Sequence, residues 1–298
     1  MSKSSKNASP SKFLNTPKSP WSNMLNTAII VTVTCILGCG GNANASQNGK
    51  EEQGDKKTAA GTTNNSSDSI PENVRKIMEA YPDFNISYSN NQLVFPDGTT
   101  IVYDDGKKKS FVEKLDDCDV EDMFSMTYDR TATTPAYLND CGRGRSEQLY
   151  KKMYGHSEAE AKKNLVDVEW FGQKIPFTKV NGANLQLAKV AEDLKALPEM
   201  RKYLTNASSF YWRKVRGANR QSAHSYGIAI DINTSYSNYW LWSNPNCSET
   251  DKLKYENKIP QEIVEIFEKH GFVWGGRWYH YDTMHFEYRP ELLFEDGK

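Results

Sequence analysis

Hydrophobic and polar residues follow two different periods along the chain, and these periods predict helices and strands. Residues 85–106 alternate apolar and polar positions around Asp97-Gly98, a pattern that is typical of a β-hairpin. The runs 227–233 and 285–288 have the apolar character of short strands. Helical spacing of apolar residues predicts helices within 157–165, 183–197 and 260–271. Because helices and strands are mixed irregularly, we predict an α+β fold with a small mixed or antiparallel sheet and flanking helices.

Residues that start and stop helices support these ranges. Ser157 and Glu160 have the spacing of a capping box, which predicts that a helix starts there. Pro198 follows the second predicted helix, where a proline interrupts helical hydrogen bonding. Pro260 fits the first turn of the third helix, and Gly271 fits its end.

The N-terminal part of the chain has the composition of an export signal. Residues 1–38 carry four lysines and no acid, and they end in an uncharged apolar run that is short for a membrane span. The letters ILGC, ending at Cys39, resemble a bacterial lipobox. We therefore predict a lipoprotein-type signal peptide over 1–38 and a lipid anchor at Cys39. Ordinary cleavage after ANA (43–45) and an uncleaved anchor helix are the alternatives, and all three interpretations export the rest of the protein.

The predicted signal is followed by a polar tether and then by folded protein. Residues 39–69 are mostly Gly, Asn, Ser, Lys and Glu, and they cannot bury enough apolar surface to offset the entropy of ordering. We predict a disordered tether over 39–69, an N-terminal β-hairpin region over 70–110 and the main domain over 111–298. The hairpin region could pack on the main domain or recognise glycan, and its sequence leaves both open.

Charge and cysteine content narrow the class of protein. The net charge is −1 and the first 38 residues are basic, so the body is mildly acidic, which argues against nucleic acid as a partner. Beyond the signal, Cys118, Cys141 and Cys247 show none of the CxxC spacings of structural zinc sites. An exported protein can form disulfides. We predict a Cys118–Cys141 disulfide, although the sequence alone does not determine the pairing.

The segment 220–233, RQSAHSYGIAIDIN, places polar residues beside an apolar strand. Gly227 allows a tight turn after His224, and the alternating isoleucines that follow face the core. Asp231 faces the other way and needs a partner, because a lone buried carboxylate is costly. His224 could reach the same place from across the turn.

The segment 280–288, HYDTMHFEY, offers further ligands. If a strand begins at Met284, His285 and Glu287 share one face, and Asp282 lies on the loop before it. Glu287 could support a ligand or compete with Asp282 as a base.

One metal site can be assembled from the two segments. His224, Asp231 and His285 would surround a divalent cation with Asp282 beside it. Two imidazoles and one carboxylate suit Zn²⁺ with a fourth position for water, and such an open site is normally catalytic. The alternatives are a hydrogen-bonded core histidine at His285, an Asp231 that accepts backbone N–H groups, and an exported structural lipoprotein without metal.

These residues also form motifs of a known family. SAHSYGIAID resembles the S-x-H-x-x-G-x-A-x-D motif of the VanY-like zinc D-alanyl-D-alanine carboxypeptidases, and GFVWGGRWYHYDTMHFEYRPEL resembles the C-terminal motif of that family, which contains D-x-x-H. The similarity extends back through LNDCGRGRSEQLYKKMYG and covers most of 110–295. The resemblance implies a zinc site like that of the DD-peptidases and the hedgehog signalling domain. It makes 111–298 a zinc peptidase domain with one Zn²⁺ per chain.

The resemblance also implies a role for each matching residue. His224, Asp231 and His285 match the zinc ligands, Asp282 matches the catalytic acid and base, and Ser222 matches a serine that holds substrate.

The family further uses an arginine upstream of the first ligand to polarise the scissile carbonyl. Arg213, Arg216 and Arg220 are candidates, of which we favour Arg213 and then Arg220 as catalytic. The aromatic residues Trp274, Tyr279 and Tyr281 could line the peptide cleft, although a place in the core fits Trp274 at least as well.

Compartment and resemblance together imply a substrate. An exported, membrane-anchored zinc peptidase of this kind would meet peptidoglycan stem peptides in the periplasm or cell wall, and removal of a terminal D-Ala is the reaction expected first. One alternative is an endopeptidase that cuts inside the stem, for instance between L-Ala and D-Glu. Another is a zinc-containing lipoprotein that binds cell wall without catalysis, and the presence of Asp282 favours catalysis over it.

Overall fold

The computed structural model describes residues 69–294, which lie in one compact unit. The predicted signal peptide, the anchor at Cys39 and the predicted tether up to residue 68 lie outside the described residues. Within 69–294, no helix is both long enough and apolar enough to cross a membrane.

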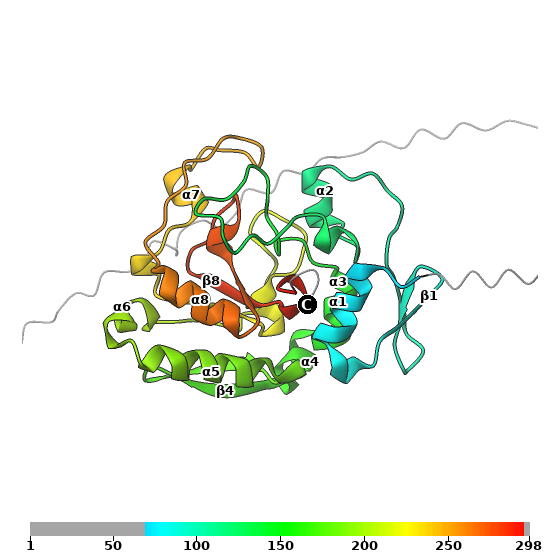
Figure 1. Cartoon of the computed structure of the whole chain (residues 1–298), viewed down its shortest axis with the longest axis horizontal. Helices are drawn as coiled ribbons and strands as arrows, with labels where there is room; N and C mark the ends of the chain where they lie inside the picture. The colour runs from blue at the N-terminus through cyan, green and yellow to red at the C-terminus, as the bar shows by residue number, and fades with distance from the viewer. Residues whose placement is uncertain (1–68, 295–298) are drawn as a thin grey trace, which may run out of the picture. The chain divides into compact units, whose positions relative to one another are not determined.

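The N-terminal region consists of one helix and a small antiparallel sheet (Figure 1). Its elements are α1 (Glu72–Ala80), β1 (Ser87–Ser89), β2 (Gln92–Val94) and β3 (Thr100–Val102). The hairpin predicted around Asp97-Gly98 is confirmed as β2–β3, and Gly98 has the positive φ of +82° that its turn requires. A second hairpin, β1–β2, turns at Asn90 and Asn91, which both have positive φ.

The rest of the described chain mixes helices with two further sheets. Its helices are α2 (Phe111–Asp116), α3 (Glu147–Tyr154), α4 (Glu158–Lys163), α5 (Ala183–Lys195), α6 (Arg201–Leu204), α7 (Trp240–Ser243) and α8 (Gln261–Lys269). Its strands are β4 (Leu165–Trp170), β5 (Gln173–Thr178), β6 (Ala229–Asp231), β7 (Phe272–Trp274) and β8 (His285–Tyr288). The predicted α+β class is therefore confirmed.

The predicted helix starts and ends are confirmed, except that Pro260 lies one position before its helix and not in the first turn. The Ser157 hydroxyl accepts a hydrogen bond from the backbone N–H of Glu160 at 3.3 Å and caps α4. Helix α5 ends before Pro198. Pro260 precedes α8, and Gly271 follows it with a φ of +86°.

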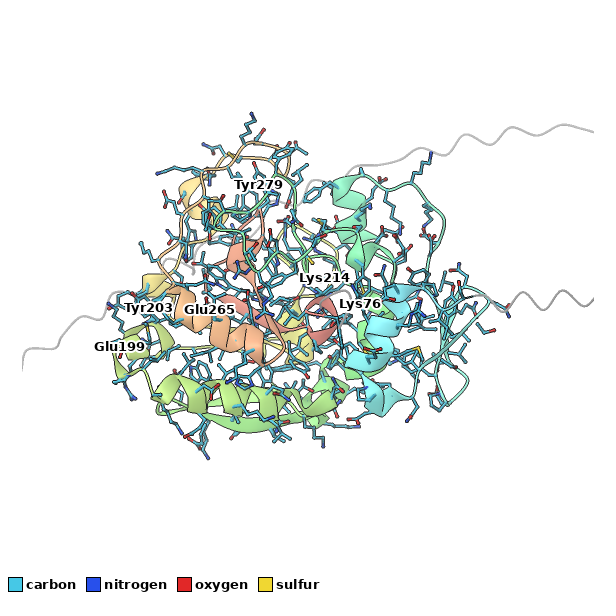
Figure 2. All side chains as sticks on the ribbon, viewed as in Figure 1. Lys76, Glu199, Tyr203, Lys214, Glu265 and Tyr279 are labelled. Carbon is cyan, nitrogen blue, oxygen red and sulfur yellow. The ribbon has the colours of Figure 1, made fainter. Side chains whose placement is uncertain are left out.

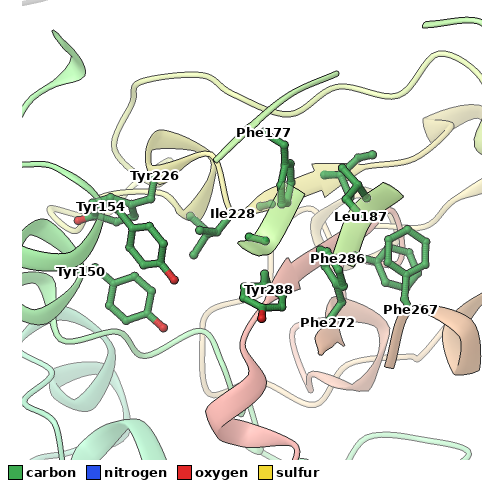
Figure 3. Close-up of a cluster of buried hydrophobic side chains, with 14 of the residues drawn as sticks. Tyr150, Tyr154, Phe177, Leu187, Tyr226, Ile228, Phe267, Phe272, Phe286 and Tyr288 are labelled. Atoms are coloured by element: carbon green, nitrogen blue, oxygen red, sulfur yellow. The ribbon is translucent and has the colours of Figure 1, made fainter. Parts of the chain in front are cut away.

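A three-stranded antiparallel sheet with the order β6–β8–β7 lies at the centre of the fold. Helix α8 packs against β7, and α5 contacts both α8 and the β4–β5 hairpin (Figure 1). On β8, Phe286 lies in the core, stacked on Phe267 of α8 with ring centres 3.9 Å apart (Figure 3). His285 and Glu287 point to the opposite face, as their alternation predicts.

The N-terminal region shares the core of the main body. Val74 and Ile77 of α1 and Leu93 of β2 are fully buried in the same hydrophobic cluster as Phe286. Of the two roles left open for 70–110, the structure shows packing on the main body.

The predicted Cys118–Cys141 disulfide is wrong for this structure, in which both thiols are free. The Cys118 thiol lies 3.3 Å from the carbonyl oxygen of Asp119, at the edge of the main core. Cys141 is buried in a separate small cluster with Tyr128 and Val273. The two sulfurs therefore have different surroundings and do not bond.

Candidate metal centre and active site

A short 3-10 turn, η5 (Ala223–Tyr226), carries the first predicted ligand, His224. The turn ends at Gly227, where φ is +68° and a Cβ atom would lie 2.5 Å from the Leu165 side chain. Only glycine fits this reversal without displacement. The chain then enters β6, so the ring of His224 is held beside the end of that strand.

Strand pairing brings the other two predicted ligands together. Asp231 on β6 and His285 on β8 are direct cross-strand partners, so their side chains project from the same face. The Asp231 side chain is 22% exposed, whereas His285 is 7% exposed. Sequence-distant segments thus meet where the prediction placed them.

The three candidate ligand atoms form a small triangle. His224 Nε2 is 3.2 Å from Asp231 Oδ1 and 3.2 Å from His285 Nδ1, and His285 Nδ1 is 3.0 Å from Asp231 Oδ1. Atoms that bind one zinc ion tetrahedrally at 2.0–2.1 Å lie about 3.3 Å apart. The triangle therefore fits one such ion and leaves one coordination position for a further ligand.

The imidazole nitrogens that face away from the triangle are both bonded. His224 Nδ1 donates to the carbonyl oxygen of Ser209 at 2.7 Å. His285 Nε2 lies 3.0 Å from the Glu287 carboxylate, which is fully buried. These bonds fix each ring so that an unprotonated nitrogen faces the ion, which is the usual support of a metal-bound histidine. The sequence leaves Glu287 two roles, either as support for a ligand or as a base in competition with Asp282. Because its carboxylate lies behind His285, the first role remains.

The electrostatics of the triangle favour a cation. Burial alone would lower the pKa of His285, but Asp231 and Glu287 raise it to about 10. Two carboxylates on either side of one imidazole therefore stabilise positive charge at this place.

Asp282 lies beside the triangle but outside it. The group of residues whose ligand atoms all lie within 4.8 Å of one another contains His224, Asp231 and His285 but not Asp282. The Asp282 Oδ1 atom is shielded from solvent and has no hydrogen-bond partner among the described residues. Burial and the neighbouring Asp231 carboxylate raise the pKa of Asp282 to about 7.

A close backbone approach fixes the loop that carries Asp282. Its N–H donates to the carbonyl oxygen of Gly275 at 2.9 Å, and a Cβ atom on Gly275 would lie 2.5 Å from the Asp282 carbonyl oxygen. On the other side, Asp282 forms a β-bridge with Tyr239. The Asp282 carboxylate is therefore positioned by its backbone from two sides.

Two of the candidate arginines have different surroundings. Arg213 is exposed, and its backbone is bonded to η5 through Ser222 and Ser225 at 3.0 and 2.9 Å. Its charge lowers the pKa of Asp282, but less than the charges of His285 and His224 do. Arg220 is 9% exposed and forms an ion pair with Asp116 of α2. Arg220 is therefore engaged in the fold, and the catalytic role predicted for it as second choice loses its support.

The predicted substrate contacts differ in their exposure. Ser222 is 4% exposed and begins η5 two residues before His224. Trp274 lies in the core at 3% exposure, and its indole N–H donates to the Thr283 carbonyl oxygen. Tyr281 is fully buried, and its hydroxyl donates to the Lys254 carbonyl oxygen. Trp274 and Tyr281 therefore support the loops and do not line a cleft, which corrects the prediction for both.

Tyr279 also has a supporting role in the loops (Figure 2). Its N–H donates to the carbonyl oxygen of Asn139 and its hydroxyl to that of Asp251, so it joins two loops of the chain. Trp278, which the sequence did not single out, packs its ring 5.4 Å from that of His285. Nothing in the local pattern distinguishes Trp278 from its aromatic neighbours.

A second group of possible ligands, Asp140, Glu249 and His280, already surrounds a guanidinium. Arg143 Nη1 donates to Asp140 at 2.5 Å and to Glu249 at 3.0 Å. The Asp140 carboxylate also accepts the backbone N–H of His280 at 2.9 Å and lies 2.6 Å from its ring. We assign this group to an ion-pair network that anchors the loop before Asp282. His280 is buried in this network.

The region that holds the triangle matches a known protein family. Residues 216–288, about a quarter of the chain, match the family model described as D-alanyl-D-alanine carboxypeptidase. The match confirms the resemblance of these motifs to those of the VanY-like D-alanyl-D-alanine carboxypeptidases. Peptidases of this family are typically metal-dependent, and the triangle is where this chain could hold the ion. Neither the curated proteins nor the solved structures contain a match to the chain.

The match covers part of the candidate site. It includes His224, Asp231, Asp282 and His285, and it ends at Tyr288. Arg213 lies outside the matched residues, and so do the residues beyond β8 that contact Glu287.

Proposed function

We propose that this protein is an exported zinc carboxypeptidase that releases the terminal D-Ala of peptidoglycan stem peptides. The observation that carries the proposal is the triangle of His224, Asp231 and His285, with sides of 3.0–3.2 Å, inside the region that matches D-alanyl-D-alanine carboxypeptidases. The family match supports the class of reaction. The geometry supports a position for the ion inside the triangle, with the carboxylate of Asp282 beside it.

Zinc is the proposed ion because two imidazoles and one carboxylate are among its usual ligands. When bound, zinc supplies a Lewis acid and lowers the pKa of a water molecule to about 7. The carbonyl oxygen of Ser209 holds the ring of His224 in the required orientation, and the carboxylate of Glu287 does the same for His285. Asp231 contributes the negative charge that partly neutralises the ion.

Asp282 is the proposed acid and base. Its carboxylate would take the proton of the attacking water and later give a proton to the departing amine of D-Ala. Its pKa is raised well above that of an ordinary carboxyl, which favours proton transfer nearer neutral pH, and Oδ1 has no hydrogen-bond partner among the described residues. Because Asp282 lies outside the triangle, it can perform this role without being a ligand.

Arg213 is the proposed stabiliser of the negative charge that develops on the carbonyl oxygen. It is exposed, carries its charge close enough to lower the pKa of Asp282, and is bonded through its backbone to the turn that carries His224. Ser222, between Arg213 and His224 in the chain, is the proposed substrate contact.

A digest of purified muropeptides tests the reaction. Full-length protein loaded with Zn²⁺ should remove one alanine from stems that end in D-Ala-D-Ala, and chelator should abolish this. Mass spectrometry of the products locates the cut. A cut between L-Ala and D-Glu would replace the carboxypeptidase by the endopeptidase, and stoichiometric zinc without any cleavage would favour the cell-wall-binding lipoprotein.

We also propose that the protein is lipid-anchored through Cys39 and faces the periplasm or cell wall. The support is the sequence pattern of residues 1–39. In cells fed labelled palmitate, the protein should carry label and sediment with membranes, and Cys39→Ser should lose both. Cys35→Ser is the matched control and should keep both. Label that follows Cys35, or no label in the unaltered protein, would contradict the anchor at Cys39.

A further inference from the structure

A continuous series of buried, hydrogen-bonded side chains leads from His285 to the N-terminal helix α1. It begins at Glu287, whose carboxylate lies 3.0 Å from His285 Nε2. Because this contact keeps the proton on Nε2, it leaves Nδ1 free to face the ion. The position of the Glu287 carboxylate therefore sets the orientation of the His285 ring.

Glu287 is itself held by two arginines. Arg289 Nη1 donates to Glu287 Oε1 at 2.9 Å, and Arg145 Nη1 lies 3.2 Å from Oε2. Glu287 and Arg289 are completely buried, and the Arg145 side chain is 9% exposed. Because Glu287 and Arg289 are buried, these charge-assisted bonds determine where the carboxylate lies.

Arg289 is fixed in turn from the far side. Its Nε donates to Glu291 Oε1 at 2.5 Å, and its Nη1 also donates to the carbonyl oxygen of Gly142 at 2.8 Å. Its guanidinium lies over the ring of Tyr150, 5.2 Å from the ring centre. Arg289 therefore cannot shift toward or away from Glu287 unless Glu291 shifts as well.

Glu291 receives its remaining bonds from two tyrosines on other elements. Tyr81, which caps the C-terminal end of α1, donates to Glu291 Oε2 at 2.7 Å. Tyr150 on α3 donates to Oε1 at 3.1 Å, and Figure 3 shows its hydroxyl at the edge of the buried aromatic cluster. Tyr81 is 1% exposed, and Glu291 and Tyr150 are completely buried.

The charges in this series balance. The two arginines, Arg145 and Arg289, face the two carboxylates of Glu287 and Glu291 in the protein interior. Neutralising one carboxylate leaves a buried guanidinium without its partner, so the remaining groups must rearrange. That rearrangement would reach His285 through Glu287.

We propose that Tyr81 and Glu291 are positioning residues for the metal ligand His285, acting through Arg289 and Glu287. The inference rests on the metal centre of the proposed function and goes beyond it, because it gives the N-terminal region a part in preparing that centre. Tyr81, Arg289 and Glu291 all lie outside the residues that match the family.

Metal affinity of the full-length chain tests the proposal. Zn²⁺ and Co²⁺ dissociation constants are measured by competition with a chromophoric chelator for the unaltered protein, Tyr81→Phe and Glu291→Gln. Glu291→Gln should weaken binding by about 10-fold or more, as changes to groups behind a ligand do. Tyr81→Phe should weaken it by a smaller factor. Both should change the visible spectrum of bound Co²⁺.

Tyr103→Phe is the matched control. Tyr103 lies in the same N-terminal region at 9% exposure. Its hydroxyl accepts a 3.5 Å hydrogen bond from Asn73 and contacts no member of the series among residues 69–294. Its metal affinity and Co²⁺ spectrum should equal those of the unaltered protein, even if its melting temperature falls.

The outcomes separate the inference from the proposed function. Unchanged affinity and spectrum in both folded variants would overturn the inference while leaving the metal centre intact. Equal loss of affinity in Tyr103→Phe would overturn it too, because general destabilisation would then suffice. Absence of metal binding by the unaltered protein would overturn both.

Discussion

Asp231 and His285 are direct partners across the antiparallel pair β6–β8, and their facing atoms lie 3.0 Å apart. This register places one ligand from each of two distant segments on the same face of the sheet. His224 joins them from the turn before β6. The position of a bound ion would thus be set by strand pairing and by one short turn, which favours a site whose geometry exists before substrate arrives.

Loss of the charge of one triangle residue should strongly weaken metal binding. Asp231→Asn keeps the size of the side chain but removes the charge, so the affinity for Zn²⁺ should fall by at least about 100-fold. Isothermal titration of full-length protein with Zn²⁺ measures this. Asp167→Asn, a substitution of an exposed aspartate on β4, should leave the affinity unchanged. Tight binding by Asp231→Asn would place the ion elsewhere.

Asp282 should be essential for turnover and dispensable for metal. Asp282→Ala should bind Zn²⁺ with nearly unchanged affinity and lose about 10²–10⁴-fold in kcat, the usual contribution of a general acid–base group. Metal content and release of D-Ala are measured on the same sample. Loss of the metal together with the activity would instead identify Asp282 as a ligand.

The pH dependence of turnover follows from the raised pKa of Asp282. Its base function needs the carboxylate, so kcat/KM should fall about tenfold per pH unit below its pKa. That pKa is about 7 in the structure, and a bound cation stabilises the anion and moves it lower. The acidic limb should therefore lie at or below pH 7, and Asp282→Glu should shift it. A limb that does not move in Asp282→Glu would assign it to another group.

Substitution of Arg213 should lower kcat, whereas substitution of Arg220 should lower stability. Arg213→Ala should lower kcat by about 10²–10³-fold with little effect on stability, because an exposed cation stabilises the developing oxyanion. Arg220→Ala removes a buried side chain together with its ion pair to Asp116 and should lower the free energy of unfolding by about 1–3 kcal/mol. Hydrolysis assays and urea denaturation separate the two. Arg216→Ala, at the third candidate arginine, which is exposed, is the control and should change neither.

The Asp140 network should contribute stability that acid removes. Burial raises the pKa of Asp140, but Arg143 and His280 outweigh it and lower the pKa to about 2. A carboxyl with a depressed pKa stabilises the fold above its unfolded pKa of 3.8, and the contribution, about 2 kcal/mol, is lost as pH falls from about 4 to about 2. The stability difference between the unaltered protein and Asp140→Asn, measured with chelator present, should shrink over that range. Asp83→Asn, at an exposed site, should show no such trend.

Local patterns predicted the parts of this molecule that local forces determine. Alternation along 227–233 and 285–288 identified both strands and the face of each ligand, and capping residues identified the helix ends. The contacts that connect distant segments had no local signal. The ion pair of Arg220 with Asp116 and the burial of Tyr281 depend on how loops pack, and the separate surroundings of Cys118 and Cys141 likewise follow from tertiary packing.

Strand β8 presents the metal triangle on one face and the stacked Phe286 of the hydrophobic core on the other. A ligand that binds only the folded state raises its population, so an ion at His285 also secures the interior of the protein. Under the proposed function, the supply of zinc would then determine how many molecules survive proteolysis, in addition to how many are active. Cells starved of zinc should lose the polypeptide itself.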